Sequence, residues 1–274
     1  MTSDLRQDGP AAARWLLAST LAIAAIVTAT SLLGLFGDWA YAAETQNWRL
    51  QAQGQDVGNL LAVVALLAGG FSMSRGSTRG LLIWASSLLY LIYAFAIYAV
   101  ALHFGGLFLP YLAVLGLSSF SLAFGIRGRR HDVRLAGRSR TAACWVLIVI
   151  GTAFGLLWLG SIIPSLIVGQ EPAELATAGL VANPVHVLDL ALVLPAMIIT
   201  GVEARRGRPE GLLWLVPWLG FSTLMGASVV AAMVLIMARE TQGATGPLVF
   251  LLVVVAASVW SLVAALRQLE LSPR

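Results

Sequence analysis

Eight apolar segments run through this chain of 274 residues, and their length constrains the fold more than any other feature. An α-helix needs about 20 apolar residues to cross the hydrocarbon core of a bilayer. The segments are residues 15–36, 57–73, 81–102, 107–126, 142–163, 184–202, 212–237 and 247–266. The chain is 59% apolar and only 11% charged, a composition typical of membrane proteins. The sequence therefore predicts an all-α integral membrane protein with eight transmembrane helices.

The arginines predict how these helices are oriented. All 17 basic side chains are arginine, and 15 of them lie in the terminal segments or in every second connection. Only Arg49 and Arg239 lie in the alternate connections. Because positively charged segments stay on the cytoplasmic side, we expect a protein of the bacterial plasma membrane with both termini in the cytoplasm. A signal peptide is the alternative for the first segment, since Arg14 precedes it and small residues follow it at 40–42.

Several kinds of chemistry are excluded by residues that the chain lacks. Without lysine there is no phosphate-binding loop of the Gly-Lys-Ser/Thr kind and no Schiff base. The single Cys144 excludes an intrachain disulfide and a Cys-x-x-Cys centre. Three histidines are too few for the multi-histidine metal sites of membrane oxygenases. We therefore expect no cofactor and no metal, and we find no nucleic-acid motif.

The chain resembles itself when it is shifted by 130 residues. Asp56 then falls on His186, and Asn59 falls on Asp189. Further matches are Leu60 with Leu190, Val63 with Val193, Arg75 with Arg205, Leu82 with Leu212 and Trp84 with Trp214. Because four spans return the chain to the same side, such halves have the same orientation. We expect a single membrane domain over residues 1–274, with tandem four-helix repeats at 12–130 and 141–268; chance similarity between apolar helices is the alternative.

Asp189 is the only acidic residue inside a predicted span, and a charge at mid-bilayer costs about 2.5 to 3.5 kcal/mol on insertion scales. If Asn183 caps this helix and Pro184 begins it, Asp189 lies about 8 Å from its outer end. His186 precedes Asp189 by three residues and shares its helical face. Asp56 and Asn59 have the same spacing beside the second span.

These four residues and His103, at the outer end of the third span, are the candidate ligand-binding residues. We expect an outward-facing polar pocket between the repeats, suited to a cation, a proton or a polar head group. The alternative is that they cap helix starts and satisfy one another. The predicted outer loops 37–56 and 164–183 occupy equivalent places and can cover the outer face. The second contains Glu171-Pro172, a plausible start for a short surface helix.

Two sequence runs carry a resemblance to uncharacterised bacterial multi-span membrane proteins with about eight helices. One is Asn183-Pro-Val-His-Val-Leu-Asp189 and the spans around it, with Gly-Leu-Leu-Trp at 211–214. The other is Arg-Gly-Ser-Thr-Arg-Gly-Leu-Leu at 75–82, before a tyrosine-rich span. The resemblance covers most of the chain. It implies the multi-span architecture and no particular activity.

Three functions are compatible with these observations. The repeat, the polar outer residues and the prolines at 195 and 217 favour a binder or transporter of a small or lipidic molecule. A structural or accessory subunit of a membrane complex needs no site. An enzyme would depend on His186 and Asp189, and we lean against it. Expected partners are membrane lipids, with the arginine-rich run 127–140 against anionic head groups, and a homo- or hetero-oligomer is compatible.

Overall fold

The computed structural model describes residues 9–127, 133–135, 137–239 and 245–271. Within these ranges eight helices are long and apolar enough to cross a membrane, which confirms the predicted all-α membrane fold. Seven of them are α1 (Gly9–Phe36), α2 (Gln46–Ser74), α3 (Thr78–Ala101), α4 (Phe108–Gly125), α5 (Gly137–Val168), α9 (Pro209–Arg239) and α10 (Thr245–Gln268). The remaining span joins α7 (Pro184–Leu188), the π-helical turn η1 (Asp189–Val193) and α8 (Leu194–Arg205).

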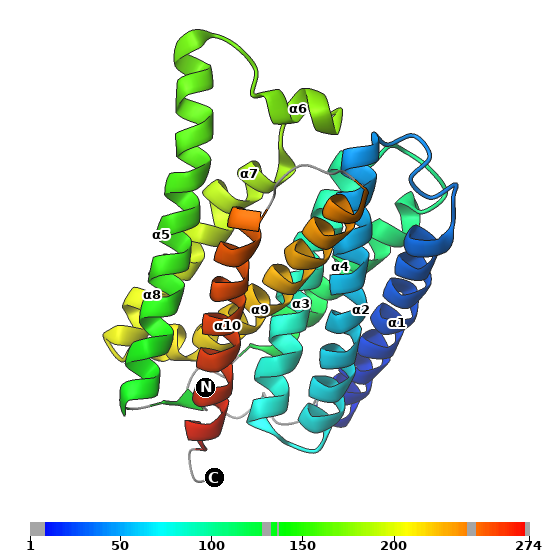
Figure 1. Ribbon diagram of the computed structural model, residues 1–274. Helices are drawn as coiled ribbons and strands as arrows, with labels where there is room; N and C mark the ends of the chain where they lie inside the picture. The colour runs from blue at the N-terminus through cyan, green and yellow to red at the C-terminus, as the bar shows by residue number, and fades with distance from the viewer. Residues whose placement is uncertain (1–8, 128–132, 136, 240–244, 272–274) are drawn as a thin grey trace.

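Three short elements lie outside the spans. The helix α6 (Ala173–Ala178) follows α5 and crosses back toward the start of α2 (Figure 1). The strands β1 (Val133–Arg134) and β2 (Glu270–Leu271) form one antiparallel pair at the opposite end of the bundle. The start of α6 directly after Glu171-Pro172 confirms the short helix predicted there.

The eight spans pack as two sets of four (Figure 1). In the first set, α1 and α3 each contact α2 and α4; in the second, α5 and α9 each contact α8 and α10. The sets meet where α9 packs against α2 and α3. The order of packing is thus the same in both sets, while the tandem repeat itself stays a prediction.

Small residues let α2 and α9 approach closely. A Cβ atom added at Gly54 would overlap the backbone of Ala232, and one added at Gly58 would overlap Ser228 and the hydroxyl of Tyr90. Glycines spaced four residues apart on one face commonly permit such an approach between membrane helices. The contact between the two sets therefore depends on residues that have no side chain.

The turns that join α2 to α3 and α8 to α9 have the same geometry. Each contains a glycine in the left-handed region, Gly76 with φ of 83° and Gly207 with φ of 73°. In each turn the next residue donates its N–H to a carbonyl five residues earlier, Ser77 to Ser72 and Arg208 to Glu203. This is the hydrogen-bond pattern that closes a helix before a sharp reversal.

The predicted start of the second span was wrong. The prediction placed it at residue 57 after a long loop, whereas α2 begins at Gln46 and is capped by Thr45, whose hydroxyl accepts from the Trp48 N–H at 3.2 Å. Seven of the first eleven residues of α2 are polar in sequence, yet Gln55 and Asp56 among them are buried. Hydropathy misses a polar helix that packs against protein instead of lipid. Asp56 therefore lies about three turns inside the helix and does not cap it.

The arginines of the described chain gather at one end of the bundle, except Arg49 at the start of α2 and Arg239 at the end of α9. Successive spans alternate in direction, so these two exceptions lie at the other end, with α6. We call this the arginine-poor end. Part of the run 127–140, predicted to contact lipid head groups, lies outside the described residues.

Candidate functional site

A cavity with a volume of about 270 Å³ lies between the two sets of helices, toward the arginine-poor end. Its wall takes residues from α2, α3, α5, α9, α10 and the segment 183–197. Most are apolar: Ile97, Leu102, Ile150, Phe154, Val185, Val193, Leu194, Met197, Phe221, Met225, Val229, Leu251 and Val254. The polar ones include Gln51, Gln55, Tyr93, Tyr98, Trp158, Asn183, Asp189, Ser222 and Ser228. An apolar cavity with a few polar groups is the usual form of a small-molecule site.

Among the described residues that line the cavity, Asp189 is the one with a carboxylate. Its Oδ1 accepts a hydrogen bond from the hydroxyl of Tyr93 at 3.0 Å, and its Oδ2 accepts one from Nε1 of Trp158 at 2.8 Å. The side chain is 9% exposed. These two donors, from α3 and α5, fix the carboxylate at the boundary between the two sets of helices.

The helix that carries Asp189 is locally widened. Asn183 caps it by accepting from the N–H groups of Val185 and His186, and Pro184 is its first residue, both as predicted. The π turn then begins at Asp189 and ends just before Leu194 and Pro195. Because Pro195 has no N–H, the regular α-helical bond to residue 191 cannot form there. Turns of this kind are frequent at functional sites.

His186 packs beside the cavity, outside its wall. Its ring lies against the indole of Trp158, with centroids 4.6 Å apart and planes at 41°. The Trp158 side chain therefore contacts both members of the predicted pair, through a tilted ring contact with His186 and a hydrogen bond donated to Asp189. His186 supports the tryptophan that holds the carboxylate.

Asp56 and Asn59 lie in a second polar cluster, enclosed by the first set of helices. Both side chains are fully buried. The hydroxyl of Tyr41 donates to Asp56 Oδ2 at 2.7 Å, and that of Tyr98 lies 3.0 Å from Oδ1. Nδ2 of Asn59 lies 3.3 Å from Oγ of Ser31 and 3.5 Å from Asp56 Oδ1. We call these five residues the Asp56 cluster.

Tyr41 closes the Asp56 cluster from the arginine-poor end. It belongs to the connection between α1 and α2, and its side chain is only 2% exposed. Burial, and secondly a negative charge on Asp56, raise the pKa of Tyr41 well above its ordinary value. The hydroxyl therefore keeps its proton and remains a donor to the carboxyl group.

Tyr98 connects the Asp56 cluster to the cavity. It lines the cavity wall, and its hydroxyl lies 2.9 Å from the Ala52 carbonyl as well as 3.0 Å from Asp56. A further polar pair lies nearby, because Nε2 of Gln55 donates to the hydroxyl of Tyr90 at 2.5 Å. One wall of the cavity is thus backed by buried polar groups of α2 and α3.

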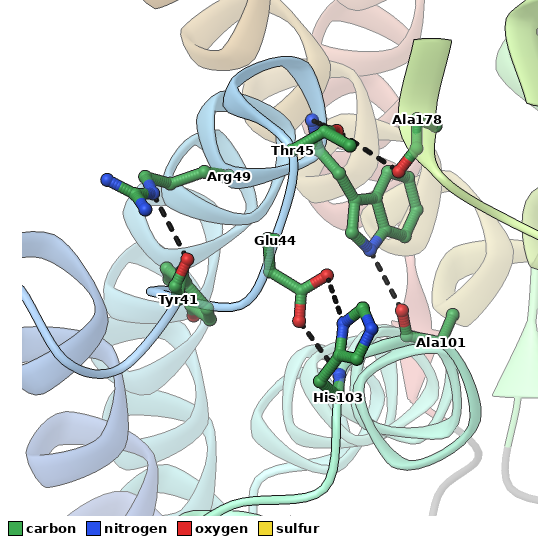
Figure 2. Close-up of polar contacts among 8 residues, drawn as sticks. Tyr41, Glu44, Thr45, Arg49, Ala101, His103 and Ala178 are labelled. Atoms are coloured by element: carbon green, nitrogen blue, oxygen red, sulfur yellow. Dashed lines mark hydrogen bonds and ion pairs between the residues drawn. The ribbon is translucent and has the colours of Figure 1, made fainter. Parts of the chain in front are cut away.

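His103 lies at the surface, away from both groups. Its Nδ1 is 3.1 Å from Glu44 Oε2, and its backbone N–H donates to Oε1 at 2.8 Å (Figure 2). Beside this pair Thr45 donates to the carbonyl of Ala178 in α6 at 3.1 Å (Figure 2). Nε1 of Trp48 donates to the Ala101 carbonyl at 2.9 Å. These contacts tie the ends of α2, α3 and α6 together over the cavity.

The candidate residues therefore do not share one pocket in the structure. Of the five candidate residues only Asp189 lines the cavity, with His186 beside it; Asp56 and Asn59 lie behind Tyr98, and His103 lies on the surface. The candidate residues predicted from the sequence did not include Tyr98, Tyr93 or Trp158. The tyrosine-rich third span was a usable signal for the first two, whereas nothing in the sequence distinguishes Trp158 from the other eight tryptophans.

Comparisons of the chain with protein-family models, with curated proteins and with solved structures give no significant match. The function must therefore be argued from the cavity and from the two acidic residues.

Proposed function

We propose that this protein binds or transports a small, largely apolar molecule that carries one amine or hydroxyl group. The single observation behind this proposal is the carboxylate of Asp189 in an otherwise mostly apolar cavity. A buried carboxylate without a cationic partner is costly in a membrane protein, and such residues commonly mark ligand or ion pathways. A ligand donor that reaches Asp189 would offset that cost.

The hydrogen bonds at Asp189 define which head group fits. Tyr93 and Trp158 each donate to a different carboxylate oxygen, and each oxygen keeps a further lone pair. An ammonium group adds a charge-assisted hydrogen bond, a hydroxyl group adds a neutral one, and an anionic group is repelled. The expected order of preference is therefore amine, then alcohol, then carboxylate. The apolar wall accommodates the rest of the molecule.

The orientation of the protein decides from which side this ligand enters. The cavity lies toward the arginine-poor end, and the positive-inside rule places that end outside the cytoplasm. A reporter inserted at residues 40–44 should be active only outside the cell, and one fused after Arg208 only in the cytoplasm. A cytoplasmic signal from residues 40–44 would reverse the proposed direction of entry.

Thermal unfolding of the full-length protein in nanodiscs tests the ligand class. Decylamine, decanol and decanoate have chains of the same length and differ in the head group. Decylamine should raise the unfolding temperature most and decanoate least, because a ligand stabilises a protein by RT ln(1 + [L]/Kd). In Asp189→Asn the amine should lose its advantage over the alcohol.

Asp56→Asn is the matched control, since it makes the same chemical change at a buried position outside the cavity wall. It should keep the preference for the amine. Equal stabilisation by all three compounds, or a preference that survives Asp189→Asn, would contradict the proposed role of Asp189.

A further inference from the structure

The Asp56 cluster places one carboxyl group where a proton can be held or released without moving any heavy atom. Asp56 is fully buried, and none of the ion pairs among the described residues involves it. Burying an unpaired charge is so costly that a group in this position commonly takes up a proton instead. The hydrogen bonds around Asp56 show how both states can be accommodated.

Tyr98 has a single hydroxyl hydrogen and two acceptors within reach. Its oxygen lies 2.9 Å from the Ala52 carbonyl oxygen and 3.0 Å from Asp56 Oδ1. When the hydrogen points to Ala52, the contact with Asp56 needs a hydrogen on Oδ1, so the carboxyl group is protonated. When the hydrogen points to Oδ1, the carboxylate is ionised. Rotation of one hydroxyl group therefore separates the two protonation states.

Asn59 adds an independent observation. Its Nδ2 faces Ser31 and Asp56, but its buried Oδ1 has no hydrogen-bond partner within the described part of the chain. Buried acceptors are nearly always satisfied, so an unpartnered one calls for an explanation. The cluster around Asp56, three residues earlier on the same helix, is therefore short of donors, which favours an additional hydrogen on the carboxyl group.

The other ionisable groups around Asp56 do not neutralise it. The nearest are tyrosines: Tyr41 in the connection before α2, Tyr90 and Tyr98 on α3, and Tyr111 on α4. Arg49, two turns earlier on α2, directs its Nε to the carbonyl of Tyr41 at 3.1 Å. Tyr93 in the middle of α3 bonds to Asp189 instead. The other ionisable residues on the described parts of the helices packed against α2 lie near helix ends: Arg14 on α1, Arg79 on α3, Glu174 on α6, and Glu210 and Arg239 on α9.

We infer that Asp56 is a proton-binding site that exchanges its proton with the cavity through the hydroxyl of Tyr98. In the release step, the Tyr98 hydroxyl gives its hydrogen to a water molecule in the cavity and takes the hydrogen of Asp56 Oδ1. The products are a hydronium ion in the cavity, an ionised Asp56, and a neutral Tyr98 that now donates to it. Uptake is the reverse, and Tyr98 can serve both steps because it lines the cavity.

A proton suits this cluster better than a metal ion. The groups around the carboxyl are mainly donors, namely the hydroxyls of Tyr41 and Tyr98 and the amide of Asn59. A bound metal ion would need these oxygens as acceptors, in larger number and turned the other way. Because protons are available on both sides of a membrane, this site would give the proposed cavity a coupling ion.

Infrared difference spectroscopy of the full-length protein in nanodiscs tests the proposal without any ligand, so it can fail or succeed independently of the proposed function. The carbonyl band of a protonated carboxylic acid should be present near neutral pH, disappear as the pH rises, and be absent in Asp56→Asn. If that variant does not fold, isotope-labelled aspartate shows that the band belongs to an aspartate, and its persistence in Asp189→Asn excludes the other buried one.

Tyr98→Phe tests the route. Loss of one donor to the ionised form should move the titration to higher pH by about 1 unit or more. Hydrogen–deuterium exchange of the acid should also become at least tenfold slower, because the relay is gone. Tyr90→Phe is the matched control on the same helix and should change neither property, since its hydroxyl bonds to Gln55.

Three results would overturn the proposal: an acid band that remains in Asp56→Asn, a titration and exchange rate unchanged in Tyr98→Phe, or an acid band that sodium but not potassium removes at constant pH. The last result would assign the cluster to a metal cation.

Discussion

The two acidic residues of the membrane region lie in surroundings that differ in almost every respect. Asp56 is fully buried in the first set of helices, and its hydrogen-bond partners come from the same set. Asp189 lines a cavity at the boundary between the sets, and its partners come from both. The same residue type thus serves an enclosed polar core in one place and an accessible wall in the other. The comparison teaches that burial alone does not distinguish a ligand site from a structural or proton-holding one; access does.

The largest change in stability is expected at the contact between α2 and α9, where the two sets of helices meet. Gly54→Ala should lower the stability of the protein by about 3 kcal/mol, because the new methyl group would overlap the backbone of Ala232. Gly116→Ala is the matched control in α4, where an added Cβ meets no described atom within 4 Å. It should leave stability unchanged or raise it by up to about 1 kcal/mol. Thermal unfolding in detergent measures both, and equal effects would show that the two sets do not need this close approach.

Replacing each acid by leucine should separate the two surroundings. Asp56→Leu should cost about 2 kcal/mol, because Tyr41 and Asn59 lose an acceptor in a fully enclosed site. Asp189→Leu should cost at most about 1 kcal/mol, because Tyr93 and Trp158 can turn to water in the cavity. The folded yield after purification and the unfolding temperature report the difference. A larger loss of stability in Asp189→Leu than in Asp56→Leu would contradict the view that Asp56 is enclosed and Asp189 is accessible to water.

A smaller effect should appear in the coupling between residues. Asp189→Asn and Tyr93→Phe remove the two ends of one hydrogen bond, so their combined effect on stability should differ from the sum by about 1 kcal/mol. Asp56→Asn combined with Tyr93→Phe should be additive within about 0.5 kcal/mol, since the two residues share no bond. Strong coupling in the second pair would join the two polar groups into a single network.

The smallest effect is expected on the surface. His103→Gln removes the ring that faces Glu44, and because the His103 side chain is 61% exposed, stability should change by less than about 0.5 kcal/mol. Thr45→Val should cost about 1 kcal/mol, because it removes the cap of α2 and the bond to Ala178. Unfolding curves of the two variants provide the comparison. A His103 variant less stable than the Thr45 variant would show that the contact between His103 and Glu44 contributes substantially to stability.

Much of the fold could be predicted because lipid selects strongly for apolar helices. The number of spans followed from their length, and the cap at Asn183 and the first residue Pro184 followed from local backbone chemistry. The start of α2 could not be predicted in this way. This polar stretch packs against protein, where Gln55 and Asp56 are buried, and its packing partners α3 and α9 are distant in the sequence.

The candidate site was predictable only in part, for the same reason. An acidic residue within a span is visible in the sequence, and Asp189 does line a cavity. The placement of Asp56 behind Tyr98 depends on how α2 rotates against α3, which spacing along one helix does not specify. Trp158 contributes to the site from α5, a helix whose sequence carries no polar pattern that points to the cavity.

The π turn at Asp189–Val193 has a consequence for how the two halves of the sequence correspond. Asn59 and Asp189 are 130 residues apart, whereas the turn glycines Gly76 and Gly207, which follow the π turn, are 131 apart. The sequence matches beyond the turn at an offset of 130, such as Trp84 with Trp214, are therefore one residue out of register with the turn geometry. A π turn holds one more residue than an α turn, so it absorbs this change of offset within a single turn. Under the predicted duplication, a one-residue insertion at this turn would rotate Asp189 relative to the helix that follows, whereas Asp56 lies in a regular α-helix.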